Sequence, residues 1–212
     1  MPEARPAALP PGERPVGQLV AESIRFYGER FWAVLPLGIP VVVVDVAGLG
    51  HGVSVQTLFL WAAAPLFCAA YVRACSIALG EVPTAAAALA ALIVFLPFPV
   101  LLRIYVLPGV AWFGLLGLAV PAAVAERLPL RAALRRGLEL GRADLVHAIG
   151  GIATLGLVYG VSRYALLVLL HTQGDQARNV AVVLSDLVLS PLLFLGATLL
   201  YVDQAARISP VE

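Results

Sequence analysis

The chain has 212 residues, of which 61% are hydrophobic and 13% are charged, and its formal net charge at pH 7 is +1. Soluble domains carry about 25% charged residues, so too few polar side chains remain here to cover a water-soluble fold of this size. The composition also excludes a disordered chain and a disulfide-rich secreted domain, and the balanced charge gives no electrostatic basis for binding nucleic acid. It therefore predicts a membrane protein.

The chain begins with a proline-rich segment that is followed by an amphipathic one. Residues 1–14 lack the basic start and apolar run of a signal peptide, so we expect a disordered cytoplasmic tail. Residues 16–32 place apolar side chains at helical spacing. On the other face, Arg25 lies three residues after Glu22 and four before Glu29, where ion pairs support a solvated surface. We predict an amphipathic helix at the membrane surface.

Long apolar runs follow, and a helix needs about 20 apolar residues to cross the bilayer core. Residues 82–125 form a run about twice that length with Arg103 as its only charge, so we expect it to fold back near Arg103 and Pro108-Gly109. The first run contains two prolines and Asp45, and its continuity stays open. We predict six spans, at residues 31–49, 53–72, two within 82–125, 145–170 and 180–202.

The arginines indicate the orientation, because cytoplasmic loops accumulate basic residues. Two arginine-rich segments, residues 5–30 and 127–142, require an even number of crossings between them if they share one side. The opposite side holds Arg103 and Arg178. We therefore predict a protein of the cell membrane with both termini in the cytoplasm.

A second amphipathic segment, residues 130–145, repeats the pattern of residues 16–32. Pro15 and Pro129 precede the two segments, and Pro83 marks a weaker third start. This predicts three units, each an interfacial elbow helix followed by a membrane hairpin. The elbows either anchor the bundle among lipid headgroups or form a docking surface for a cytoplasmic protein partner. The candidate residues of that surface are Arg25, Arg131, Arg135, Arg136 and Arg142.

Two G-x-x-x-G spacings occur in the chain. Gly156 and Gly160 lie in the fifth predicted span, where this spacing favours close packing of membrane helices. Gly137 and Gly141 repeat it in the second amphipathic segment.

Three short motifs stand out: Gly17-Gln18-Leu19-Val20 with Phe26-Tyr27 and Phe31, then Pro121, Glu126 and Ala133-Leu134-Arg135-Arg136, and finally Leu200-Tyr201-Val202-Asp203 with Arg207. They resemble the motifs of a bacterial six-span membrane-domain family, known as the membrane portion of some glycerophosphoryl diester phosphodiesterases. The resemblance implies a helical membrane domain over residues 15–207, with residues 208–212 as a C-terminal tail. It implies no activity, because the phosphodiesterase chemistry belongs to a separate domain. The chain departs from the family's pattern at Gly137-Leu138, which replace the usual Ser-Trp, and at Leu145-Val146, which replace an aromatic pair.

No catalytic motif is found. The sequence has no H-E-x-x-H, G-x-S-x-G or Walker-type phosphate loop, and its three histidines fall on different segments. Cys68 and Cys75 lie seven residues apart on one predicted helix, a spacing that fits neither a disulfide nor a metal site. We therefore expect a protein that is not an enzyme and uses no cofactor or metal.

Four charged residues lie inside the predicted spans. Arg163 and Asp186 are each about seven residues from the outer ends of consecutive antiparallel spans, about 10 Å deep, so a salt bridge between them is expected. Asp45 and Arg103 lie at a similar depth. These residues form either ion pairs that hold the bundle together or a pocket that binds a lipid headgroup or small anion, to which arginine is suited.

Two functions follow from these features. The first is a non-enzymatic scaffold or accessory domain for a membrane or envelope-lipid partner. The alternative is a small transporter, or a membrane protein that binds lipid or anion, using the outer cluster of arginine and aspartate. A cavity that reaches both Arg103 and Arg163 favours the alternative. Sealed ion pairs with an exposed apolar cytoplasmic groove favour the scaffold.

Overall fold

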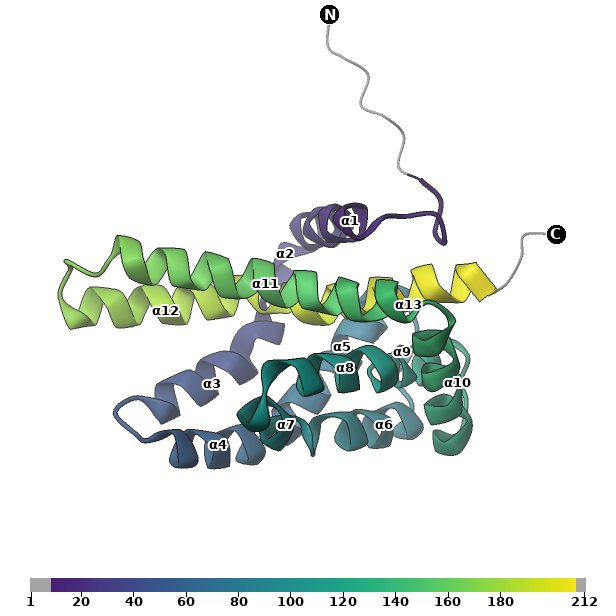
Figure 1. The fold of residues 1–212 in the computed structure, drawn as a ribbon, viewed down its shortest axis with the longest axis horizontal. Helices are drawn as coiled ribbons and strands as arrows, with labels where there is room; N and C mark the ends of the chain where they lie inside the picture. Colours follow the sequence, from purple (N-terminus) through teal and green to yellow (C-terminus); the bar gives the residue numbers. More distant parts are fainter. Residues whose placement is uncertain (1–8, 209–212) are drawn as a thin grey trace, which may run out of the picture.

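The protein is a bundle of helices. The computed structural model describes residues 9–208, and over this range every regular element is helical, which confirms the all-α prediction. Figure 1 shows α11 and α12 side by side along the longest axis, with α13 continuing the line of α12. The elements are α1 (Val16–Glu29), α2 (Phe31–Val34), η1 (Leu35–Gly38), α3 (Ile39–Gly48), α4 (Val53–Ala62), α5 (Ala64–Leu79), α6 (Ala85–Phe95), α7 (Phe98–Ile104), α8 (Val106–Leu116), α9 (Ala119–Ala125), α10 (Leu130–Ala143), α11 (Leu145–Leu169), α12 (Asp175–Leu189) and α13 (Pro191–Ile208).

Six membrane spans can be counted within residues 9–208. One of them is the pair α4 and α5, which is bent by 52°. Pro65 stands in the first turn of α5 and cannot donate a backbone hydrogen bond to α4, which accounts for the break. The other five stretches are long and apolar enough to cross a membrane without such a sharp bend. They are Phe31–Gly48, Ala85–Ile104, Val106–Ala125, Leu145–Leu169 and Gln176–Ile208.

The long third run folds back at Tyr105, whose extended backbone (φ −160°, ψ 151°) separates α7 from α8. The prediction of a turn close to Arg103 is confirmed, but Pro108-Gly109 is not part of it. Pro108 lies in the first turn of α8, where a backbone N–H has no helical partner and its loss costs little. Gly109 is buried against Leu102 of α7.

The first span is helical but interrupted. The turn of η1 separates α2 from α3, with Pro36 within η1 and Pro40 in the first turn of α3. Gly38 lies at this break, and a Cβ atom there would stand 2.3 Å from the carbonyl oxygen of Leu187. The missing side chain thus allows α12 to approach the interrupted span.

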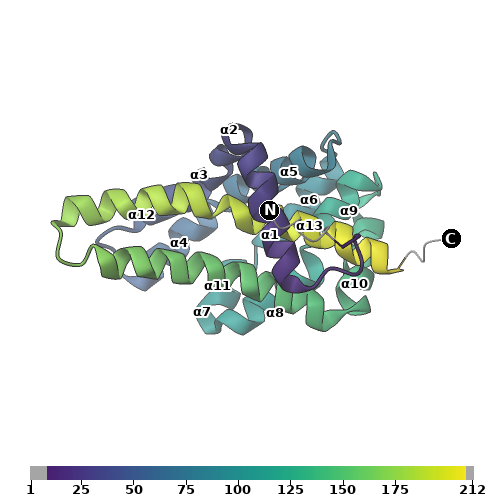
Figure 2. The ribbon, with the colours of Figure 1, turned by 90° about the horizontal axis from the view of Figure 1, so that it is seen from above.

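Two amphipathic helices lie across the bundle. Figure 2 shows α1 crossing over α11 and α13, and it packs on both through a face that includes Leu19, Ser23 and Tyr27. In Figure 1, α10 lies across one end of the bundle. The prediction of a third elbow helix, starting near Pro83, is wrong. Residues 80–84 lead directly into the span that begins with α6, and Thr84 caps that helix by accepting from the backbone N–H of Ala87 at 3.1 Å.

The close packing expected of Gly156 and Gly160 is absent there, and Gly137 and Gly141 show it instead. No neighbour stands within 4 Å of a Cβ built at Gly156 or Gly160, so this pair makes no close helix contact. A Cβ at Gly137 would lie 2.4 Å from the backbone nitrogen of Ala119 in α9, and one at Gly141 would lie 2.9 Å from the oxygen of Gly114 in α8. The glycines of α10 therefore set how closely this elbow packs on the bundle.

Candidate functional site

Arg163 of α11 holds two carboxylates. Its Nε lies 3.2 Å from Oδ1 of Asp186 on α12, and its Nη2 forms an ion pair with Asp45 on α3. The side chain of Asp186 has 0% of its surface exposed, against 31% for Arg163 and 26% for Asp45. The hydroxyl of Tyr159 donates to Oδ1 of Asp186 at 2.5 Å. We call these four residues the Arg163 cluster.

The local fold explains how these side chains meet. Tyr159 and Arg163 are four residues apart on α11, so they share one face of that helix. α12 returns antiparallel beside this face, and α3 packs against α12, which brings Asp45 to the same point. The expected contact between Arg163 and Asp186 is thus present. The expected two separate ion pairs are not present, because Arg163 pairs with both aspartates. Arg103 instead donates to Oγ of Ser54 at 3.4 Å.

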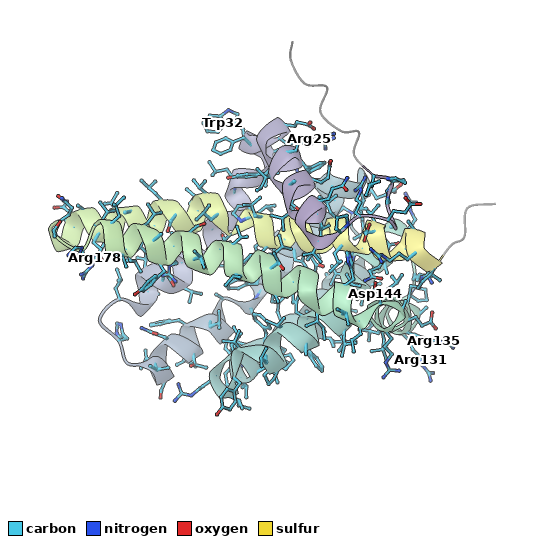
Figure 3. The ribbon with its side chains drawn as sticks, turned by 45° about the horizontal axis from the view of Figure 1, so that its top comes forward. Arg25, Trp32, Arg131, Arg135, Asp144 and Arg178 are labelled. Atoms are coloured by element: carbon cyan, nitrogen blue, oxygen red, sulfur yellow. The ribbon has the colours of Figure 1, made fainter. Side chains whose placement is uncertain are left out.

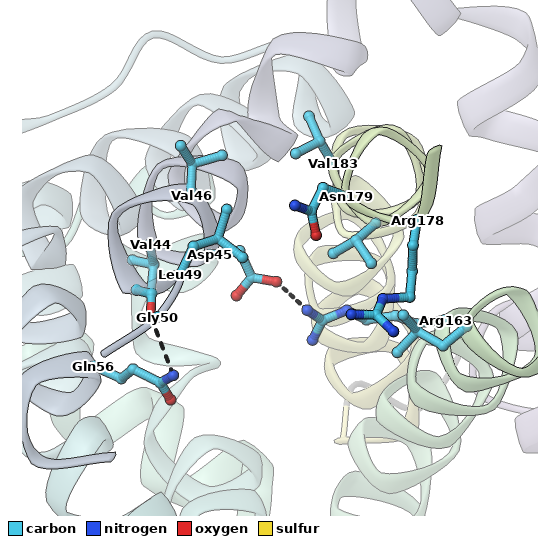
Figure 4. A pocket seen from close by; sticks show the side chains of 13 residues that line it. Val44, Asp45, Val46, Leu49, Gly50, Gln56, Arg163, Arg178, Asn179 and Val183 are labelled. Atoms are coloured by element: carbon cyan, nitrogen blue, oxygen red, sulfur yellow. Dashed lines mark hydrogen bonds and ion pairs between the residues drawn. The ribbon is translucent and has the colours of Figure 1, made fainter. Parts of the chain in front are cut away.

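A polar pocket of about 410 Å³ opens beside the Arg163 cluster. Figure 4 shows Asp45 and Arg163 pointing toward one another, with Arg178 next to Arg163 and Asn179 on the same wall. Gln56 closes another side, donating to the carbonyl oxygens of Gly48 and His51 at 3.3 and 3.1 Å. We call this the outer pocket.

A second and larger cavity, of about 680 Å³, lies between α3, α4, α7 and α11. Arg103 and Arg163 both line it, together with Asp45, Thr57 and Tyr159. We call it the lateral cavity. It shares Asp45 and Arg163 with the outer pocket, so the two spaces adjoin at the Arg163 cluster. This is the arrangement that favours ligand binding over a sealed structural pair.

A third space, of about 280 Å³, adjoins the lateral cavity. The two share Val41, Phe67, Phe98, Leu102 and Tyr159 in their walls. Apart from the hydroxyl of Tyr159, its lining side chains are apolar. We call it the apolar chamber.

A polar network at the other end of the bundle was not anticipated. Arg207 of α13 lies 2.9 Å from Oδ2 of Asp144 and 3.2 Å from Oδ2 of Asp203, and Nε2 of His147 lies 2.8 Å from the same Asp203 oxygen. Asp203 is fully buried. The i, i+4 spacing of Asp203 and Arg207 was the available sequence signal, but nothing in it pointed to Asp144 or His147.

This network also holds the N-terminal segment. The backbone N–H of Gly12 donates to Oδ1 of Asp203 at 2.8 Å, and Nη2 of Arg207 donates to the carbonyl oxygen of Arg14 at 3.0 Å. The expected disordered tail of residues 1–14 is therefore docked on α13 over residues 9–14. Arg5 and the rest of residues 1–8, like residues 209–212, lie outside the described residues.

The five candidate arginines of the cytoplasmic surface do not form one patch. Figure 3 shows Arg25 on α1 well apart from Arg131 and Arg135 on α10. Arg25 pairs with Glu22 and Glu29, and Arg135 pairs with Glu139. Arg136 bonds to Glu126 beside α10. Oε1 of Glu126 accepts from Nε of Arg136 at 3.0 Å and from the hydroxyl of Tyr201 at 2.9 Å. Arg131 and Arg142 are exposed.

Within residues 9–208, no group of three or more histidine, cysteine, aspartate or glutamate side chains is placed to hold a metal ion. His51 and His171, in separate loops, bond to the nearby backbone carbonyl oxygens of Leu49 and Val168. Comparison of the chain with protein-family models, with curated proteins and with solved structures finds no match. The candidate site is therefore interpreted from its own geometry.

Proposed function

We propose that the protein binds a ligand carrying a phosphate or carboxylate group from the outer half of the bilayer, with both termini in the cytoplasm. The observation that carries this proposal is the lateral cavity, which is lined by both Arg103 and Arg163. Its volume of about 680 Å³ lies within the range of about 300–1,000 Å³ that is usual for small-molecule sites. No reaction is part of the proposal.

The charges around the cavity favour an anion. Two arginines, Arg103 and Arg163, line the lateral cavity with Asp45 as the one acid among its lining residues, and Asp186 pairs with Arg163 without lining the cavity. Arg163 is already committed to both carboxylates, so it is held rigidly at the cavity wall. Arg103 is exposed, and its contact to Ser54 at 3.4 Å is long, so most of its five donors can turn to a ligand.

The orientation is supported by the two ends of the bundle. Figure 3 shows Arg178 at the opposite end from Arg131 and Arg135, and the arginine-rich α10 lies at the end where α13 finishes. Basic residues accumulate on the cytoplasmic side. The α10 end is accordingly assigned to the cytoplasm, and the outer pocket to the opposite side.

The test is lipid retention, measured by native mass spectrometry in a nonionic detergent with added phosphatidylglycerol. We expect Arg103→Gln to lower the affinity about tenfold, because one charge-assisted contact to phosphate is lost. Arg131→Gln, an exposed arginine of α10, is the matched control and should behave as the unchanged protein. Equal retention by Arg103→Gln, or an equal loss in Arg131→Gln, would contradict the proposal.

A second proposal is a scaffold for a membrane or envelope-lipid partner. It is favoured by the exposed positions of Arg131 and Arg142 on α10. The same spectra test it. A protein partner that binds in fixed stoichiometry and is lost in Arg131→Glu would support this role. Partner binding that is unchanged in Arg131→Glu would contradict the assigned surface.

A further inference from the structure

The lateral cavity has a polar end and an apolar end. Arg103, Arg163 and Asp45 line the outer part, while the apolar chamber continues it toward the centre of the bundle. Tyr159 stands at the junction of the two, because its ring lines both spaces and its hydroxyl is held by Asp186. The wall therefore changes from charged to hydrocarbon along one continuous path.

Aromatic rings dominate the chamber. Phe95, Phe113 and Phe194 lie in its wall, with ring centroids 5.7 Å apart for Phe95 and Phe113 and 6.4 Å apart for Phe95 and Phe194. These rings come from α6, α8 and α13, and each side chain is buried by neighbouring helices. The chamber is thus formed by packed elements of the core, and no charged side chain reaches it among the residues that line it.

We infer that the ligand is an amphiphile with a single acyl chain in the apolar chamber and its anionic headgroup in the lateral cavity. The inference rests on the proposed function and deepens it. An anion without a chain would leave the apolar chamber unfilled, whereas a hydrocarbon without a charge would leave Arg103 unused. An acyl chain suits this space because it needs no hydrogen-bond partner there and gains contacts with the rings.

Gly156 offers a specific way to fill the chamber. It lies in the chamber wall, and a Cβ built there meets nothing within 4 Å, so Gly156→Leu adds a side chain without forcing the helix backbone to move. Gly160, one turn later on the same helix, is equally open but does not line the chamber. Gly160→Leu is therefore the matched control. Val110→Phe fills the same space from α8 and serves as a second variant.

The experiment reconstitutes the full chain in phosphatidylcholine vesicles with a lysophosphatidylglycerol that carries a photoreactive diazirine near the end of its chain. After irradiation, labelled residues are mapped by mass spectrometry. We expect labelling of Phe113 or Phe194, a loss of at least fivefold in Gly156→Leu and Val110→Phe, and no change in Gly160→Leu.

Other results would overturn the inference. Labels confined to exposed residues such as Leu157 and Val161 would show that the acyl chain stays in the bilayer. The same conclusion would follow if labelling of the chamber were unchanged in both Gly156→Leu and Val110→Phe. The proposed function is judged separately by Arg103→Gln. If that variant lowers retention of phosphatidylglycerol while the chamber is unlabelled, headgroup binding stands and the chain assignment fails. If the amount of labelling in the chamber is the same in Arg103→Gln as in the unchanged protein, both proposals fail.

Discussion

Arg163 and Asp186 face each other across the antiparallel helices α11 and α12, with Nε and Oδ1 3.2 Å apart and the carboxylate fully buried. Removing one partner of such a pair leaves an unpaired charge away from water, which is commonly more costly than removing both. We expect Arg163→Ala to lower the free energy of unfolding by about 3 kcal/mol.

Adding Asp186→Ala to that variant should restore part of the loss, as measured by chemical unfolding in detergent. Arg103→Ala is the control, because the contact of Arg103 to Ser54 is long and exposed, and its loss should change stability little. A double variant as unstable as the sum of the two single ones would show that the pairing contributes nothing.

The glycines of α10 provide a second prediction. Gly137→Ala would place a Cβ 2.4 Å from the backbone of Ala119, so we expect a loss of about 1–3 kcal/mol in unfolding free energy. Gly156→Ala meets no neighbour, and alanine favours helix by up to about 1 kcal/mol, so stability should be equal or higher. Equal effects of the two substitutions would contradict the assigned packing.

The docked N-terminal segment, residues 9–14, provides a third prediction. Arg207→Gln removes the bond to the Arg14 carbonyl oxygen and the ion pairs to Asp144 and Asp203. We expect the amide of Gly12 to exchange its hydrogen about tenfold faster, because local opening becomes easier. Hydrogen exchange followed by mass spectrometry measures this. Arg142→Gln, on the exposed face of α10, should leave the rate unchanged, and equal rates in both variants would contradict the docking.

The orientation can be tested by labelling single cysteines. Cys68 and Cys75 are buried and are replaced by alanine to give a silent background. Thr172→Cys, in the loop between α11 and α12, should react with a membrane-impermeant maleimide on intact cells. Ala143→Cys, at the end of α10, should react only after the membrane is opened. The reverse pattern would place both termini outside.

The number of spans could be predicted from the sequence because it depends on local properties, namely apolar length and the sparse charges. The positions of the breaks could not. Pro108-Gly109 is a typical turn sequence, yet the chain turns at Tyr105, because proline is also well tolerated in the first turn of the helix that follows. Likewise, the spacing of Gly156 and Gly160 does not reveal whether another helix approaches them. That depends on tertiary packing.

The candidate site shows the same limit. Depth along consecutive spans was enough to predict the contact of Arg163 with Asp186, since antiparallel neighbours bring equal depths together. It did not predict that Asp45 would share the same arginine, because the place of α3 beside α12 follows from the close approach at Gly38. The apolar chamber is assembled from seven separate helices and left no local sequence signal.

The docking of residues 12 and 14 on α13 has a consequence for the order of assembly. The ribosome makes this segment before residues 31–208, but its binding site lies in the last span of that range. The segment therefore cannot dock until Asp203 and Arg207 have been synthesised. Its attachment marks the moment at which the whole bundle has been inserted.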